Sequence, residues 1–337
     1  MSVIYCPTRF ALGSPFFSPD MIRFAKQLIP SFDIVNLQTM WGYGTKPLSN
    51  ICVNSGVPYY ISLRGQYMDY AMKQVDIIKR IKKKLFLSLV GFDYLNNASA
   101  FHSTSEMEAD QLKSYPITTP IFIIPNCVEI EDFNKPTRKG IFRGEFRIPE
   151  NALVLILVGR LQEKKNPEIA VSALIEAQKL QSDVHLLIVG PDEENFKQKL
   201  YQQAQDANCE GKLHFTGLLE TEKLRSALSD SDLILMPSDD ENFGRSAAEA
   251  MAAGLPILTY TGVPVGYCAK EGGAGEIVSL DNKVFSEKTM ELLSNPYLLK
   301  KMGEKGKILA RDLFAADVVA EKMLSKLEEI VVGYEKQ

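Results

Sequence analysis

The feature that most constrains the fold of this chain is a regular alternation of short apolar runs with longer helical patterns. The runs are rich in Val, Ile, Leu and Phe and are apolar on both faces, which is typical of parallel strands covered by helices on both sides. The sequence therefore predicts an α/β fold. The expected strands are Asp33 to Leu37, Pro58 to Leu63, Ala98 to Phe101, Ile121 to Ile124, Leu153 to Val158, His185 to Val189, Leu213 to Phe215, Leu233 to Met236 and Pro256 to Leu258.

A polar stretch with Pro and Gly, Lys135 to Gly140, interrupts the alternation and fits an interdomain linker. We predict two doubly wound, Rossmann-like domains at 1–134 and 151–314, joined by a linker at 135–150. The segment 315–337 is expected to be a helix that follows a break near Phe314 and packs back on the first domain. Two such domains facing each other would place the carboxyl ends of both sheets around one cleft, where open α/β sheets bind ligands.

Composition excludes several classes of protein. The 337 residues carry a net charge of −4 and no basic domain, so we expect no nucleic-acid partner. The longest apolar runs are far shorter than the roughly 18–20 residues of a membrane-spanning helix. The first residues lack the pattern of a signal peptide, which favours a cytoplasmic location. The cysteines and histidines are widely spaced and form no metal-binding motif, so no metal cofactor is expected.

Two cations follow the expected strand Leu153 to Val158. Arg160 and Lys165 lie in the loop that begins at Gly159 and ends before Pro167, a residue suited to the first turn of a helix. Arginine offers a fork of donors and lysine a compact charge, so the two side chains could contact one anion such as a diphosphate. Charged loops between strands and helices are common, and a solvated surface loop is the alternative interpretation.

An acidic loop, a glycine and a helix of small residues follow the strand Leu233 to Met236. Gly244 can let the backbone approach a ligand, and a helix that begins there would direct N–H groups and its positive dipole end at a phosphate. Glu241 in the loop and Glu249 in the helix can accept hydrogen bonds from hydroxyl groups, which suits two polyols joined by a phosphate bridge. That ligand is a nucleotide sugar. Glu249 could instead be an ordinary helix-surface residue, but the alanines around it favour close packing, where an unpaired charge is costly.

Together these motifs resemble the GT-B glycosyltransferases of family 4. The resemblance covers most of 98–332. It extends to Gly190-Pro191, Phe215-Thr216-Gly217, the segment His102 to Glu106 and the segment Ile124 to Glu129, in which Cys127 stands where Gly is usual.

The resemblance implies a retaining, metal-independent transfer of a sugar from a nucleotide donor. By it, Arg160 and Lys165 would hold the donor diphosphate and stabilise the charge that develops on the leaving group. Glu241 would contact sugar hydroxyls at the catalytic centre, and Glu249 would bind the ribose. The rest of the donor site would consist of Gly159, Asn242, Phe243 and Gly244.

The first domain departs from the family at the strand that ends in Asn36-Leu37-Gln38. Relatives usually have a His-x-His pattern there, whose second His reaches the donor sugar, whereas Gln38 can hydrogen-bond but cannot be charged. An ordinary strand-end residue is the alternative for Gln38. Arg64 and Gly65, in the next strand-exit loop, and His102 would face the acceptor.

A second departure lies at the beginning of the chain. Relatives open with a strand, a Gly-rich loop and a helix that line the cleft, and Val3 to Tyr5 resembles a later strand. Either the chain begins upstream of Met1 or the first domain is remodelled. We expect an incomplete first domain, lacking an N-terminal segment, and impaired catalysis in this form.

A basic amphipathic helix is predicted at residues 73–89. Six Lys and Arg residues are opposed there by a single Asp, while Ile78, Ile81, Leu85 and Leu89 recur on one face. Such a helix can lie on an anionic membrane, which would place the protein at the inner face of the plasma membrane. A helix packed on the core with a solvated basic face is the alternative.

The function predicted from these observations is transfer of a sugar from a nucleotide-diphosphate donor to a glycan or lipid-linked acceptor, in surface polysaccharide or glycolipid synthesis. The alternative is a catalytically impaired module that binds nucleotide sugars. An epimerase of the same architecture fits less well, because few histidines are available for acid–base chemistry.

Overall fold

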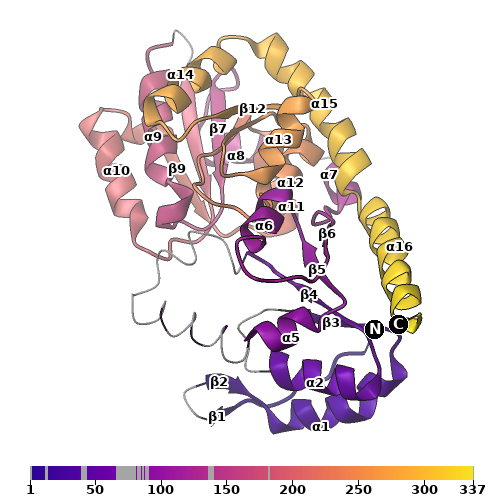
Figure 1. The fold of residues 1–337 in the computed structure, drawn as a ribbon. Coiled ribbons are helices and arrows are strands. Elements are labelled where there is room, and N and C mark those ends of the chain that lie inside the picture. The colour runs from indigo at the N-terminus through magenta and orange to yellow at the C-terminus, as the bar shows by residue number, and fades with distance from the viewer. Residues whose placement is uncertain are drawn as a thin grey trace. The chain divides into compact units, whose positions relative to one another are not determined.

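The computed structural model describes residues 2–11, 14–38, 44–65, 91–135, 140–180 and 183–336, together with Ile81, Leu85 and Leu87. The chain divides into two compact units. The first unit is Met1–Pro125 with Ala320–Gln337, and the second is Asn126–Val319. Each unit contains a parallel sheet with helices, so the predicted α/β class is confirmed (Figure 1).

The first unit is built on four parallel strands in the order β3-β4-β5-β6, each on an apolar run predicted from the sequence. All residues of β4 and β5 are buried, so both faces of these strands are covered. The strands are β3 (Val35–Gln38), β4 (Tyr59–Ser62), β5 (Ala100–Ser103) and β6 (Ile121–Ile123). Among the described residues of this unit, the helices are α1 (Pro19–Leu28), α2 (Thr45–Ser55), α5 (Phe92–Asn96) and α6 (Glu106–Leu112), with a 3₁₀-helix at Ile29–Ser31 and an antiparallel pair formed by β1 (Arg9–Ala11) and β2 (Ser14–Phe17).

The second unit contains a parallel sheet of six strands in the order β12-β11-β10-β7-β8-β9. Its strands are β7 (Leu153–Val158), β8 (Val184–Val189), β9 (Leu213–Gly217), β10 (Leu233–Met236), β11 (Ile257–Tyr260) and β12 (Gly275–Val278). Its helices are α7 (Ile130–Asn134), α8 (Ile141–Glu145), α9 (Pro167–Ala177), α10 (Phe196–Asp206), α11 (Thr221–Ser229), α12 (Arg245–Ala253), α13 (Pro264–Glu271), α14 (Asn282–Leu293) and α15 (Pro296–Phe314), with 3₁₀-helices at Glu163–Lys165 and Glu210–Lys212. The last helix, α16 (Ala316–Glu335), begins in this unit.

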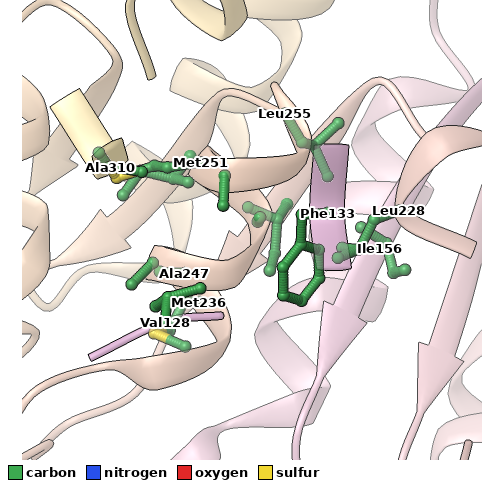
Figure 2. Packing of buried hydrophobic residues seen from close by; sticks show 14 of the residues in the cluster. Val128, Phe133, Ile156, Leu228, Met236, Ala247, Met251, Leu255 and Ala310 are labelled. Carbon is green, nitrogen blue, oxygen red and sulfur yellow. The ribbon is translucent and has the colours of Figure 1, made fainter. Parts of the chain in front are cut away.

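Two hydrophobic cores cover the two faces of the six-stranded sheet. Successive residues of a strand point to opposite faces, and Ile156 of β7 accordingly joins one core while Leu155 joins the other. Helices α11, α12 and α13 pack on the first face and α9, α10 and α14 on the second. Figure 2 shows part of the first core, to which Ile156 of β7, Met236 of β10 and Met251 of α12 contribute.

Local sequence signals set the ends of the long helices. Pro167 begins α9, and Pro296 begins α15 after Asn295, whose side chain accepts a hydrogen bond from the Leu298 N–H at 3.0 Å. The predicted break near Phe314 is confirmed: Ala315 is extended, and the Phe314 carbonyl accepts from the Val128 N–H at 2.7 Å. A carbonyl at the end of a helix has no partner within the helix, and the bond to Val128 supplies one.

The division into units lies earlier than the predicted linker at 135–150. Phe142 and Ile148 are buried in the core of the second unit, and the N–H groups of Gly140 and Phe142 donate to the Asp230 carboxylate at 2.6 and 2.9 Å. The described part of this segment is therefore fixed to the second unit despite its polar composition. At the other end, the residues that group with the first unit begin at Ala320 within α16, not at 315.

The expectation that Val3 to Tyr5 forms a strand is wrong. These residues adopt no regular structure, and their side chains are exposed. The strand β12, by contrast, was not predicted, because its sequence Gly-Glu-Ile-Val lacks a continuous apolar run.

Candidate functional site

The order of strands in the second unit reverses between β7 and β10. These two strands are hydrogen-bonded neighbours, yet β8 follows β7 on one side and β11 follows β10 on the other. Loops that leave the carboxyl ends of two such strands diverge and open a crevice, where α/β sheets bind ligands. The loops after β7 and β10 are the two that carry the predicted donor-binding motifs.

The loop after β7 is held close to its neighbours. A Cβ atom on Gly190 would lie 1.9 Å from the Gly159 carbonyl oxygen, so only glycine permits this approach of the two loops. Arg160 is more than half exposed, and its Nη1 lies 3.3 Å from the Glu193 carboxylate. Asn166 donates from its Nδ2 to the Pro237 carbonyl at 2.9 Å, which ties this loop to the loop after β10.

The loop after β10 leads into the N-terminus of α12. Gly244 stands immediately before the helix with a φ of +98°, in the left-handed region that favours glycine. The first N–H groups of a helix have no partner within it and carry its positive dipole end. Ala247, Ala248, Ala250 and Ala252 of α12 are buried against the core, as predicted from their grouping in the sequence.

The environment of the Glu249 side chain differs from both environments predicted from the sequence. Its side chain is 15% exposed, and its Oε1 accepts a charge-assisted hydrogen bond from Arg245 Nε at 2.8 Å. It is therefore neither a solvated surface residue nor an unpaired buried charge. The second carboxylate oxygen retains capacity to accept hydroxyl hydrogen bonds.

Lys165 and Glu241 form a partly buried ion pair between the two loops. Only 17% of the lysine side chain and 11% of the glutamate side chain are exposed. The backbone N–H of Glu241 donates to the Gly262 carbonyl at 3.0 Å, so the acidic partner is fixed from its own backbone. The pair orients the lysine ammonium at the junction of the loops, while its other N–H donors remain available.

These loops and the start of α12 line one pocket of about 330 Å³. All eight residues predicted on the catalytic and donor sides lie in its wall. The lining is Asn126, Val158, Gly159, Arg160, Lys165, Met236, Glu241, Asn242, Phe243, Gly244, Arg245, Ser246 and Glu249. The sequence interpretation did not assign Asn126, Arg245 and Ser246. The last two could have been found from their place in the first turn of the helix.

The four residues predicted on the acceptor side lie in the first unit, at or beyond the carboxyl ends of its strands. Three of them belong to a chain of hydrogen bonds across the sheet. Arg64 Nε donates to Gln38 Oε1 at 3.2 Å, Gln38 Nε2 donates to Asn36 Oδ1 at 2.9 Å, and Asn36 Nδ2 donates to Ser62 Oγ at 3.1 Å. The Ser62 hydroxyl lies 3.3 Å from His102 Nδ1.

His102 lies at the end of this series of hydrogen bonds, and its imidazole is neutral. Its Nε2 lies 2.9 Å from the Ile124 carbonyl, which can only accept, so Nε2 carries the proton. Burial lowers the pKa of His102, and the charge of Arg64 acts in the same direction. The histidine is therefore a positioned hydrogen-bonding group at neutral pH.

A buried carboxylate that sequence reasoning missed holds Gly65. Glu108 is 1% exposed and accepts hydrogen bonds from the Gly65 N–H at 2.5 Å and from the Thr104 N–H at 2.8 Å. Ser105 caps α6 by accepting from the Glu108 N–H at 3.2 Å. The spacing Ser-x-x-Glu at 105–108 is the sequence signal of such a capping arrangement.

Within the described residues, no group of three or more His, Cys, Asp or Glu side chains could hold a metal ion. In the same part of the chain, no helix is both long and apolar enough to cross a bilayer. The predicted membrane-binding helix at 73–89 lies outside the described residues except for Ile81, Leu85 and Leu87, of which the first two are exposed and the last is buried.

This geometry defines an α/β unit that places basic side chains and a helix N-terminus at the point where its strand order reverses. The family model for the glycosyl transferases group 1 matches residues 139–308, just over half of the chain, and the chain belongs to this family. The match contains both loops of the pocket.

Known proteins of this kind resemble the chain in sequence and fold. The D-inositol 3-phosphate glycosyltransferase of Segniliparus rotundus is 25% identical over 237 residues, which are 68% of this chain and 52% of that protein. The alpha-monoglucosyldiacylglycerol synthase of Streptococcus pneumoniae is 23% identical over 71% of this chain and 54% of its own length. The chain thus spans about half the length of the curated relatives it matches.

Among solved structures, HepE of Anabaena in complex with UDP has the same fold. The TM-score is 0.77 at 15% identity, over 92% of this chain and 82% of that chain. The likeness confirms the predicted GT-B fold.

Proposed function

We propose that this protein is a retaining glycosyltransferase that moves a sugar from a nucleotide-diphosphate donor to a glycan or lipid-linked acceptor. The observation that carries the proposal is the pocket at the β7–β10 reversal, where Arg160, Lys165 and the N-terminus of α12 meet Glu241 and Glu249. Family membership and the names of the relatives support it. HepE, for instance, has also been solved with UDP-glucose.

In the proposed reaction, the bond between the anomeric carbon and the diphosphate oxygen breaks, and the diphosphate leaves with the bonding electrons. An acceptor hydroxyl forms the new bond on the same face, and its proton passes to the diphosphate. Charge develops on the leaving group, so donors placed there before the reaction lower the barrier. Arg160, Lys165 and the first N–H groups of α12 are such donors, and this set of cations would replace a metal ion.

The two carboxylates have different tasks in this proposal. Glu249 lies one turn into α12, where the free oxygen can accept hydrogen bonds from the ribose hydroxyls. Glu241 both orients Lys165 and offers hydrogen bonds to the transferred sugar. Because Glu241 is already paired, its charge balances the lysine until the diphosphate arrives.

In this proposal, residues of the first unit contact the acceptor. The amide oxygen of Gln38 accepts a hydrogen bond from Arg64, and its amide nitrogen donates one to Asn36, so the orientation of the side chain is fixed. A fixed neutral amide can position a sugar hydroxyl but cannot act as an acid or a base. We therefore assign Gln38, Arg64, Gly65 and His102 to positioning and not to proton transfer.

The test is calorimetric binding of UDP-, GDP- and ADP-sugars, with release of nucleotide and transfer of labelled sugar followed in parallel. We expect one donor to bind and to lose at least about tenfold in affinity in Glu249→Ala, because a charge-assisted hydrogen bond is worth roughly 1.5–3 kcal/mol. Glu287→Ala is the matched control, since it removes another i,i+4 ion pair on a helix outside the pocket.

The outcomes separate the two candidate functions. Donor binding with sugar transfer supports the enzyme. Binding of the same donor without transfer or hydrolysis to any acceptor would favour a nucleotide-sugar-binding module, and no binding by the folded chain would remove the basis of the proposal.

We also propose that residues 73–89 contact an anionic membrane surface, where a lipid-linked acceptor would lie. The exposure of Ile81 and Leu85, 59% and 56%, supports an apolar face that can enter the lipid. Vesicles with anionic lipid should bind the protein at low salt, and replacing the lysines at 82–84 with Gln should abolish binding. Binding that is independent of both salt and these lysines would contradict the idea.

A further inference from the structure

A second pocket, of about 460 Å³, lies at the opposite end of α12 from the candidate donor site. Ala253 and Gly254, at the C-terminus of the helix, line this pocket, whereas Arg245, Ser246 and Glu249 line the first. The nine residues of α12 span roughly 13 Å at a rise of about 1.5 Å per residue. The two pockets are therefore separate binding places within one unit.

The charged residues around the second pocket are strongly unbalanced. Lys135, Arg225, Lys300 and Lys307 line it, against the single carboxylate of Glu304. The whole chain carries a net charge of −4, so this local excess of positive charge runs against the composition. Lys300 and Lys307 form no ion pair with any described residue, whereas Lys135 pairs with Asp132.

Arg225 provides a second and independent observation. Its Nη1 donates to the Asp132 carbonyl at 2.7 Å, which fixes the guanidinium, but its Nε is buried and has no hydrogen-bond partner among the described residues. The guanidinium is therefore held at the pocket wall by a neutral carbonyl, and this contact does not neutralise its positive charge.

Helix packing brings the lysines to the pocket. Lys300, Gly303, Glu304 and Lys307 lie on one face of α15 at helical spacing. A Cβ atom on Gly303 would lie 2.0 Å from the Gly254 carbonyl oxygen, so glycine lets this face approach the end of α12 closely. Lys307 lies over Gly254, and attraction to the negative dipole end of α12 can explain the position of its charge. It does not account for the other three cations.

We propose that this pocket binds a small soluble compound that carries a phosphate or diphosphate group. The volume exceeds that of the candidate donor pocket and suits a molecule of the size of a sugar phosphate. Arg225 contributes a guanidinium fixed by the Asp132 carbonyl, and the lysines contribute compact charges around it. This combination recognises phosphate oxygens better than carboxylates or neutral sugars. The proposal is independent of sugar transfer, because it concerns binding alone.

The experiment is a calorimetric titration of the whole chain with pyrophosphate, a probe that both pockets can accept. We expect two binding events in the wild type. The double variant Lys300→Gln/Lys307→Gln should weaken one of them by at least about tenfold, since two charge-assisted contacts are removed. Arg160→Gln should weaken only the other event.

The matched control is Lys301→Gln/Lys305→Gln, which makes the same change of charge on α15 without touching the lining. The proposal is overturned if this control loses as much affinity as Lys300→Gln/Lys307→Gln, because the effect would then be general attraction. It is equally overturned if the wild type shows a single event that depends on Arg160 alone.

Two further titrations identify the source of the phosphate. Glucose 6-phosphate should compete with pyrophosphate for the event that depends on Lys300 and Lys307, and vesicles containing phosphatidic acid should not. Competition by the vesicles alone would refute a soluble ligand and assign the pocket to a lipid headgroup.

Discussion

Replacing Gly244 by alanine tests how the structure positions the candidate donor site. Gly244 has a φ of +98° and a ψ of 51°, immediately before α12. A Cβ atom there would lie 2.9 Å from Val263 Cγ1 and 3.1 Å from Val265 Cγ1. Both valines are buried, and β-branched side chains have little freedom to rotate away. The substitution therefore creates backbone strain and overpacking at once.

The expected loss of stability follows from these two terms. A left-handed conformation costs an alanine roughly 1–2 kcal/mol, and inserting a methyl group into a well-packed site costs roughly 1–3 kcal/mol. We expect Gly244→Ala to lower the free energy of unfolding by about 2–5 kcal/mol. Relief of the strain by a shift of the α12 N-terminus would also displace the N–H groups proposed to bind phosphate. Donor affinity should then fall by about tenfold or more.

Urea unfolding followed by circular dichroism measures the free energy of unfolding. Calorimetric titration with the nucleotide sugar that binds the wild type measures the donor affinity. Gly144→Ala is the control, because a Cβ atom at this position in α8 meets nothing within 4 Å. Alanine in a helix should be neutral or stabilise by up to about 1 kcal/mol. If Gly244→Ala unfolds within about 0.5 kcal/mol of the wild type, neither the left-handed backbone nor the valine contacts constrain this site.

Three further changes test other parts of the structure. Lys165→Met leaves the Glu241 carboxylate partly buried without its cation and should cost about 3–5 kcal/mol of unfolding free energy in urea, which Glu241→Leu in the same chain should partly restore. Burial and the neighbouring His185 lower the pKa of His214 to about 4, so the folded state holds this histidine neutral. The free energy of unfolding should therefore be highest above pH 6.5 and fall by about 2 kcal/mol as the pH is lowered toward 4. In urea titrations, His214→Gln should flatten this dependence on pH. Glu108→Gln turns one acceptor into a donor facing an N–H and should cost about 1–3 kcal/mol; an unchanged urea midpoint would show that Gly65 is held by other contacts.

Most of the strands and helices could be predicted from the sequence. Apolar runs and helix signals are local properties of the chain, so all nine predicted runs overlap strands and differ from them by at most two residues at each end. The breaks at Pro167 and Phe314 were predictable for the same reason, because proline and a change of helical pattern act within one turn. Val3 to Tyr5 shows the limit: three apolar or aromatic residues make a strand only when a neighbouring strand is available to pair with them.

The donor-side residues could also be read from the sequence, since each lies in a loop directly after an apolar run. That the two loops meet depends on the adjacency of β7 and β10, which are separated by two strands and three helices in the chain. Only the tertiary structure decides this order, because pairing between distant strands is selected by the packing of the whole sheet.

Three ion pairs involve residues of the candidate donor site, and two of them depend on the tertiary structure alone. Arg245 could be paired with Glu249 from helical spacing, but Lys165 with Glu241 and Arg160 with Glu193 join residues more than thirty positions apart. The basic pocket between α12 and α15 likewise has no signature in the sequence, where its four cations are spread from Lys135 to Lys307. The interactions between charges depend on their distance in space and on burial, and the folded chain sets both.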